Sequence, residues 1–197
     1  VRRERHEQRK HEQGRARWLF LAATGLGLGM LSKYTIALMA PGIFLAFLLF
    51  PALRVWWKRP SLYLAVLLAL LLTSPILIWN LQHDWASFGK QWSHAFAPQD
   101  PKPWQWFGDF VGSQAGLITP IIFLFCLWGM GWALWQGWRE RRPAWFLLGA
   151  LSLPVLLFFL ERNLSIRVQP NWPGPLYVSA IIAAVGAFEQ LRSQGRA

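Results

Sequence analysis

The apolar residues of this chain lie in long uninterrupted blocks rather than in stripes along one face of a helix. Two of these blocks, Tyr63–Trp79 and Gly116–Trp135, contain no charged residue. Each approaches the roughly 20 residues that a helix needs to cross about 30 Å of hydrocarbon. An all-α, polytopic transmembrane bundle of about six spans is therefore predicted, with spans at Trp18–Leu31, Thr35–Pro51, Ser61–Trp79, Gly116–Trp135, Ala144–Leu160 and Pro175–Leu191.

The composition agrees with a membrane protein and argues against a soluble one. Hydrophobic residues make up 54% of the 197 residues and charged residues only 15%, against about 25% charged in soluble domains. The net charge of +11 lies in short runs at the ends of the apolar blocks. That distribution argues against a nucleic-acid partner. The single cysteine, Cys126, excludes an intramolecular disulfide.

The basic residues also predict an orientation, because cytoplasmic loops carry an excess of Lys and Arg. With six crossings, the arm 1–17, the loops 52–60 and 136–143 and the tail 192–197 share one side and hold fifteen of the twenty basic residues. The arm and tail are thus predicted to be cytoplasmic, flanking a bundle at 18–191. The segments 80–112 and 161–173 become extracytoplasmic loops.

The five remaining basic residues are the candidate chemistry of the outer side, and three of them lie close to span ends. Lys33 follows a run of small residues that permits close helix contact, so we expect it to face the bundle and bind a lipid phosphate. A snorkelling lysine is the alternative. Arg167 and Arg162 are further phosphate-binding candidates, because a guanidinium donates two parallel hydrogen bonds to phosphate. For both, ordinary interfacial pairing is the alternative, in the case of Arg162 with Glu161.

Other polar and aromatic residues of the outer side are candidates for a substrate vestibule. These are Tyr34, His83, Asp84, Trp85 and Asn171. Anchoring at the membrane interface is the alternative for the aromatic ones. No closely spaced ligand set predicts a metal site, and no cofactor is expected.

Four segments together resemble a known family. They are GLGLGMLSKYTIALMAPGIFLAFLL at residues 25–49, SPILIWNLQHDWASF at 74–88, PWQWFGDFVGSQAGLITP at 103–120 and RVQPNWPGPLY at 167–177. In this order they resemble landmarks of the bacterial glycosyltransferase family 39 membrane proteins, a group that includes protein O-mannosyltransferases and the lipid A aminoarabinose transferase. The resemblance covers nearly the whole chain beyond the arm.

The resemblance implies a GT-C-like fold in the bacterial inner (plasma) membrane. A sugar would move from a polyprenyl-phosphate carrier to an extracytoplasmic acceptor, which could be a glycolipid, a polysaccharide or a protein. Lys33 and Arg167 match basic positions of the family. The family's catalytic Asp lies in an outer loop that has no counterpart here, so the chain is expected to correspond to the C-terminal portion and to be inactive alone. The catalytic residue therefore stays unknown.

Two other classes of function fit the same pattern. A lipid-phosphate transporter or flippase subunit would use the same basic and aromatic outer surface without chemistry. Transporters commonly show internal repeats, and no repeat is visible in this sequence. A non-catalytic membrane assembly protein is the third possibility.

Overall fold

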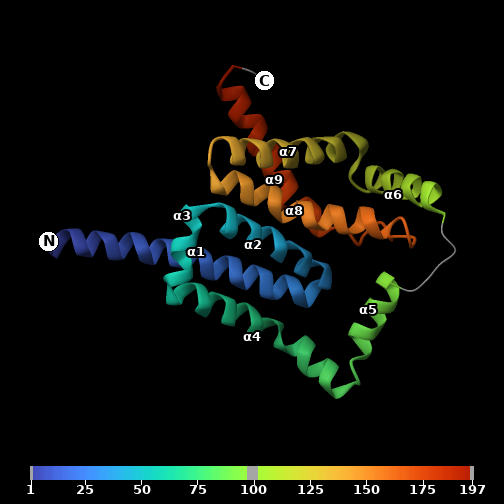
Figure 1. Ribbon diagram of the computed structural model, residues 1–197, viewed down its shortest axis with the longest axis horizontal. Helices are drawn as coiled ribbons and strands as arrows, with labels where there is room; N and C mark the ends of the chain where they lie inside the picture. Colours follow the sequence, from blue (N-terminus) through green and yellow to red (C-terminus); the bar gives the residue numbers. More distant parts are fainter. Residues whose placement is uncertain (1, 97–101, 196–197) are drawn as a thin grey trace. The chain divides into compact units, whose positions relative to one another are not determined.

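The computed structural model describes residues 2–96 and 102–195, with side chains from residue 16 onward. Every regular element in these residues is a helix, which confirms the predicted all-α fold. In chain order the elements of Figure 1 are α1 (Arg2–Ser32), the 3-10 helix η1 (Tyr34–Met39), α2 (Ala40–Leu49), α3 (Pro51–Arg54), the 3-10 helix η2 (Val55–Lys58), α4 (Pro60–Gln82), α5 (Ala86–Phe96), α6 (Pro103–Ile118), α7 (Pro120–Arg139), α8 (Pro143–Arg162) and α9 (Pro175–Ser193).

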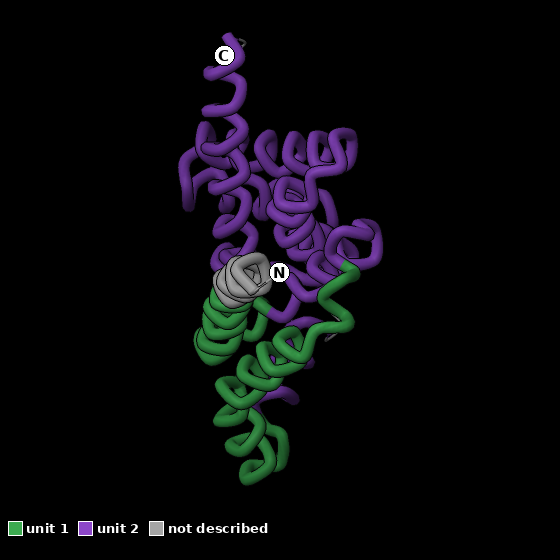
Figure 2. The backbone as a smooth tube through the Cα atoms, turned by 90° about the vertical axis from the view of Figure 1, so that its left-hand side faces the viewer, with its two compact units in different colours: residues 1–36, 54–86 green, residues 37–53, 87–197 purple. Residues whose placement is uncertain are grey.

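The helices form two compact units, which Figure 2 colours green and purple. The first unit contains α1 and α4, and these two helices pack along each other. Their contact depends on a small residue, because a Cβ added to Gly27 would lie 2.7 Å from the Cβ of Leu72 and 2.9 Å from the carbonyl oxygen of Ala69. The run of glycines before Lys33 therefore includes one residue that faces a neighbouring helix, as the sequence predicts.

The second unit contains α2 and α5 to α9, and its centre is formed by α7, α8 and α9, which pack against one another (Figure 1). The backbones approach closely at glycines. A Cβ added to Gly129 of α7 would lie 2.2 Å from the Cα of Ala184 of α9. A Cβ added to Gly42 of α2 would lie 1.8 Å from the carbonyl oxygen of Ala150 of α8. Small residues at such contacts are typical of membrane helices, whose association depends on close packing rather than on exclusion of water.

A buried pair of serines joins α8 to α9. The Ser152 hydroxyl donates to the carbonyl oxygen of Leu176 at 2.8 Å and lies 2.6 Å from the Ser179 hydroxyl. Since a serine has one hydroxyl proton, Ser179 is the donor in the second bond. Both hydroxyls are thus satisfied inside an otherwise apolar contact, where an unpaired hydroxyl would be costly.

Among the described residues, three helices are long and apolar enough to cross a membrane, namely α4, α7 and α8. The pair Tyr34–Leu49 and Pro51–Lys58 passes the same test together but is bent by 102° at Phe50, and the apolar helix Ala16–Ser32 is shorter. The predicted helix break near Lys33 is confirmed, because α1 ends at Ser32. The count of six crossings stays a prediction.

The structure corrects one feature of the predicted arrangement. The block Gly116–Trp135 is not one helix, because the chain breaks at Thr119 between α6 and α7. Thr119 precedes Pro120, which disfavours helical backbone in the preceding residue, and its φ of 69° and ψ of 146° lie outside the helical region. The segment 80–112, predicted to be an extracytoplasmic loop, contains α5 and the first turns of α6; its location stays a prediction.

Candidate functional site

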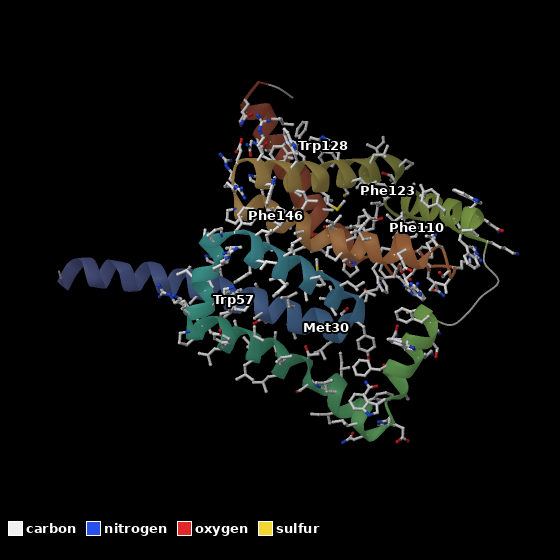
Figure 3. All side chains as sticks on the ribbon, viewed as in Figure 1. Met30, Trp57, Phe110, Phe123, Trp128 and Phe146 are labelled. Atoms are coloured by element: carbon white, nitrogen blue, oxygen red, sulfur yellow. The ribbon has the colours of Figure 1, made fainter. Side chains whose placement is uncertain are left out.

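Helix α6 presents a buried face to the rest of the second unit. Trp106, Phe110 and Gln114 recur every four residues and are all buried (Phe110 is labelled in Figure 3). That spacing places them on one side of the helix, and Pro103 begins the helix at a position where its missing N–H costs nothing. Two members of the face are aromatic and one is an amide, so α6 brings a polar group into an apolar contact.

Gln114 uses both ends of its amide to join three elements. Its Nε2 donates to the carbonyl oxygen of Pro170, in the segment between α8 and α9, at 2.9 Å. Its Oε1 accepts a hydrogen bond from the Tyr177 hydroxyl of α9 at 2.7 Å. The Gln114 side chain is 0% exposed, so these bonds satisfy a group that burial would otherwise penalise. Sequence reasoning missed this residue, although a glutamine on the same helix face as Trp106 and Phe110 is a visible signal.

The segment between α8 and α9 presents Arg167 outward. Ile166 and Val168 are buried while Arg167, which lies between them, keeps 71% of its side chain exposed. Arg167 Nη2 lies 3.3 Å from Asp109 Oδ2 of α6. An ion pair this exposed contributes little to stability, so Asp109 orients the guanidinium without blocking its exchange to another anion.

Arg162 is held by its neighbours at the end of α8. Its Nε and Nη2 donate to the two carboxylate oxygens of Glu161, and its Nη1 donates to the carbonyl oxygen of Ala95 at 3.3 Å. The guanidinium carbon also lies 4.9 Å from the centre of the Phe96 ring. The pairing with Glu161 that the sequence offered as the alternative is therefore present. Arg162 connects the end of α8 to the end of α5.

Two further groups of this region are informative. Asn163 is 1% exposed, and neither its Nδ2 nor its Oδ1 has a hydrogen-bond partner among the described residues. No sequence signal singled it out. Trp172 stacks 6.2 Å from the His94 ring of α5 and lies 6.4 Å from the Phe159 ring. Asn171, beside it, is exposed.

The other candidate residues lie in the first unit. Lys33 and Tyr34 are half-buried at the end of α1, and burial lowers the pKa of the Lys33 ammonium. His83, Asp84 and Trp85 follow α4 and are exposed. Asp84 and Trp85 have φ values of 48° and 58°, which asparagine and aspartate tolerate far better than tryptophan.

His83 is engaged by its own helix. Its Nδ1 lies 2.8 Å from the carbonyl oxygen of Trp79, and the two rings stack at 4.2 Å with an interplanar angle of 8°. The second unit brings Arg162, Arg167 and Asn171 into one segment, and the first unit holds the other five candidates. The convergence of both sets on one site stays a prediction. In the part of the chain that the structure describes, no group of three His, Cys, Asp or Glu side chains could hold a metal ion.

Comparison with known proteins shows what this helical chain is similar to. Residues 8–79 match the family described as dolichyl-phosphate-mannose-protein mannosyltransferase. Over 168 residues, or 82% of the chain, the sequence is 32% identical to the lipid A galacturonosyltransferase RgtD of Rhizobium johnstonii. These matches confirm the resemblance to membrane glycosyltransferases of family 39. The chain spans only 33% of the length of that relative. No solved structure matches.

Proposed function

We propose that this chain forms part of a glycosyltransferase of the bacterial inner membrane that moves a sugar from a polyprenyl-phosphate carrier to an acceptor on the extracytoplasmic face. The observation that carries the proposal is the similarity of 82% of the chain to a lipid A galacturonosyltransferase. The relative's name also suggests the substrate classes, a sugar acid and a glycolipid acceptor. Because the chain spans a third of that protein, we propose a contribution to the activity rather than the whole of it.

In the proposed reaction, the hydroxyl oxygen of the acceptor attacks the anomeric carbon of the carrier-linked sugar. The bond between that carbon and the phosphate oxygen breaks, and its electron pair stays on the carrier phosphate. The hydroxyl proton passes to a general base, which we do not assign to any residue of this chain. Cations near the leaving phosphate favour the reaction because negative charge grows there.

Arg167 is the residue of this chain that we propose for contact with the carrier phosphate. Its guanidinium is exposed, and its backbone segment is fixed by the buried neighbours Ile166 and Val168 and by the bond from Gln114 to Pro170. A planar guanidinium suits a phosphate because it donates two parallel hydrogen bonds. The Asp109 carboxylate 3.3 Å away keeps the fork oriented until a phosphate takes its place.

Lys33 is proposed as a second phosphate contact and Arg162 as a supporting one. Burial lowers the pKa of Lys33, which reflects an ammonium that a nearby anion would stabilise. Arg162 is already bound to Glu161 and Ala95, so its proposed contribution is to add positive potential and to hold α5 in place. The proposed vestibule for sugar and acceptor consists of Tyr34, His83, Asp84, Trp85 and Asn171.

The phosphate site can be tested by titrating the purified chain in detergent micelles with undecaprenyl phosphate and measuring binding by native mass spectrometry. Arg167→Gln should weaken binding about tenfold, because a hydrogen bond to a charged group contributes roughly 1.5 kcal/mol or more. Lys102→Gln, which removes one exposed charge next to α6, is the matched control and should bind as the parent does. Equal loss in both variants, or no loss in Arg167→Gln, would remove Arg167 from the site.

Catalysis can be tested separately from binding. Membranes that contain the protein carrying this chain should transfer radiolabelled sugar from a polyprenyl-phosphate donor to a glycolipid acceptor. Binding of the donor without any transfer would favour the transporter alternative over the enzyme.

A further inference from the structure

The turn between α7 and α8, residues Arg139–Arg142, is built with an unusual residue at its sharpest point. The N–H of Arg142 donates to the carbonyl oxygen of Gly137 at 2.9 Å, and the N–H of Arg141 donates to the carbonyl oxygen of Trp138 at 3.4 Å. This pair of bonds is the Schellman arrangement, in which a left-handed residue follows the helix and is usually glycine. Here the left-handed residue is Arg141, with a φ of 54°.

The guanidinium groups of this basic turn lie on exposed indole rings. The guanidinium carbon of Arg141 is 4.6 Å from the centre of the Trp138 ring, and that of Arg139 is 4.9 Å from the Trp135 ring. The two tryptophans are 46% and 56% exposed. Each arginine is therefore held by a cation–π contact beside an apolar surface that is open to the surroundings of the helix.

The one carboxylate within the basic turn serves other partners. Glu140 Oε2 lies 3.0 Å from Arg142 Nε, and Glu140 Oε1 accepts a hydrogen bond from the amide of Gln136. Charge pairing within the turn is thus confined to Arg142. The positive charges of Arg139 and Arg141 lie over the rings of Trp135 and Trp138 instead.

The indole under Arg141 is itself anchored in an apolar cluster. The Trp138 ring meets Phe50 edge to face at 6.5 Å and lies 6.4 Å from Phe146, which Figure 3 labels. Phe50 and Phe146 are both buried and belong to a core cluster with Ala46 and Ala150. Because Phe50 and Phe146 hold the Trp138 ring, the Arg141 guanidinium stacked on that ring is positioned before any ligand binds.

We propose that the basic turn binds the phosphate of an anionic phospholipid such as phosphatidylglycerol. Two guanidinium groups supply the charge and the hydrogen-bond donors for a phosphodiester, and basic sites at the ends of membrane helices attract anionic headgroups. The exposed indoles offer an apolar surface for the glycerol and the upper acyl chains, which a free phosphate ion could not use. The left-handed backbone of Arg141, at a position where glycine is usual, costs conformational free energy, and such strained residues cluster at functional sites.

The site is independent of the proposed transferase activity. It lies at the C-terminal end of α7, whereas Arg167 pairs with Asp109 of α6, the helix that precedes the N-terminal end of α7. The six-span arrangement predicts that the turn faces the cytoplasmic leaflet. A phospholipid bound there would hold the ends of α7 and α8 at the membrane surface.

The experiment compares phosphatidylglycerol with phosphatidylcholine of the same acyl chains, each titrated into the purified chain in detergent and followed by native mass spectrometry. The parent chain should bind phosphatidylglycerol more tightly. Arg141→Asn removes the charge but suits a left-handed backbone, and it should weaken phosphatidylglycerol binding about fivefold, the effect of one basic residue near a headgroup. Arg141→Lys should retain most of the preference.

Arg192→Asn is the matched control, because it removes an exposed arginine near the end of α9 that is paired with Glu189 and has no indole stacked on it in the part of the chain that the structure describes. It should leave the lipid preference unchanged, and sodium phosphate or glycerol phosphate at equal concentration should not displace the lipid. Equal loss in Arg141→Asn and Arg192→Asn, no preference of the parent for phosphatidylglycerol, or displacement by free phosphate would each overturn the proposal. Thermal unfolding checks that Arg141→Asn is at least as stable as the parent.

Discussion

Gln114→Leu removes the amide that joins α6 to α9 and to the segment carrying Arg167. Leucine has nearly the volume of glutamine and suits a helix, so the substitution changes hydrogen bonding while leaving packing almost intact. It deletes the bond to Pro170 at 2.9 Å and the bond from Tyr177 at 2.7 Å. The Tyr177 hydroxyl is then left half-buried without its acceptor.

The expected loss of stability follows from those two bonds. Hydrogen bonds between membrane helices average about 0.6 kcal/mol each, and a stranded buried donor adds roughly 1 kcal/mol. Gln114→Leu should therefore lower the free energy of unfolding by about 2 kcal/mol. Tyr177→Phe breaks one bond and strands the Gln114 oxygen, for a loss of about 1.6 kcal/mol. The double variant should lose only about 1.2 kcal/mol, the contribution of the two bonds, because neither partner of the bond between Gln114 and Tyr177 is then left unpaired.

Equilibrium unfolding of the purified chain in mixed micelles of increasing SDS content, followed by circular dichroism, measures these values. Gln91→Leu makes the same chemical change at an exposed position of α5 and should stay within about 0.5 kcal/mol of the parent. If the double variant loses the sum of the two single losses to within about 0.5 kcal/mol, then Gln114 and Tyr177 are not coupled. The hydrogen-bonded link between α6 and α9 would then be wrong.

Two further predictions concern helix packing and orientation. Gly42→Ala places a Cβ against the carbonyl oxygen of Ala150 and should destabilise the chain by about 1–3 kcal/mol in the same unfolding assay. Gly131 has open space around it, so Gly131→Ala should be neutral or stabilising by up to about 1 kcal/mol. Equal effects of the two substitutions would contradict the close contact of α2 with α8. In intact cells, a cysteine at Gln91 should react with a membrane-impermeant maleimide, and a cysteine at Arg59 should react only after permeabilisation; the reverse pattern would reject the six-span orientation.

The helical fold could be predicted from the sequence because each long apolar block has one stable form in a bilayer. The predicted spans Ser61–Trp79 and Ala144–Leu160 lie within α4 and α8, and each end differs from that of its helix by one to three residues. The break at Thr119 was missed because apolar content is the same on both sides of it. Only the restriction that Pro120 places on its predecessor signals the break, and that signal was outweighed by the continuous hydropathy.

The candidate site could be predicted only in part. Basic residues near span ends are visible in the sequence, and Arg167 became a candidate in this way. The residues that hold its segment were missed, because Gln114 and Tyr177 are 63 residues apart and their contact depends on how the helices pack. Asn163 was missed for the same reason, since burial of an asparagine at a helix end cannot be read from its neighbours in sequence.

The contact between Gly129 and Ala184 has a mechanical consequence. At this contact the backbones of α7 and α9 meet directly, so no flexible side chain lies between them there to absorb a displacement. A displacement of one helix at this contact is therefore transmitted directly to the other helix. Any relative movement within the second unit must then be taken up by segments outside this pair, and Thr119, whose backbone leaves the helical region between α6 and α7, is one such joint among the described residues.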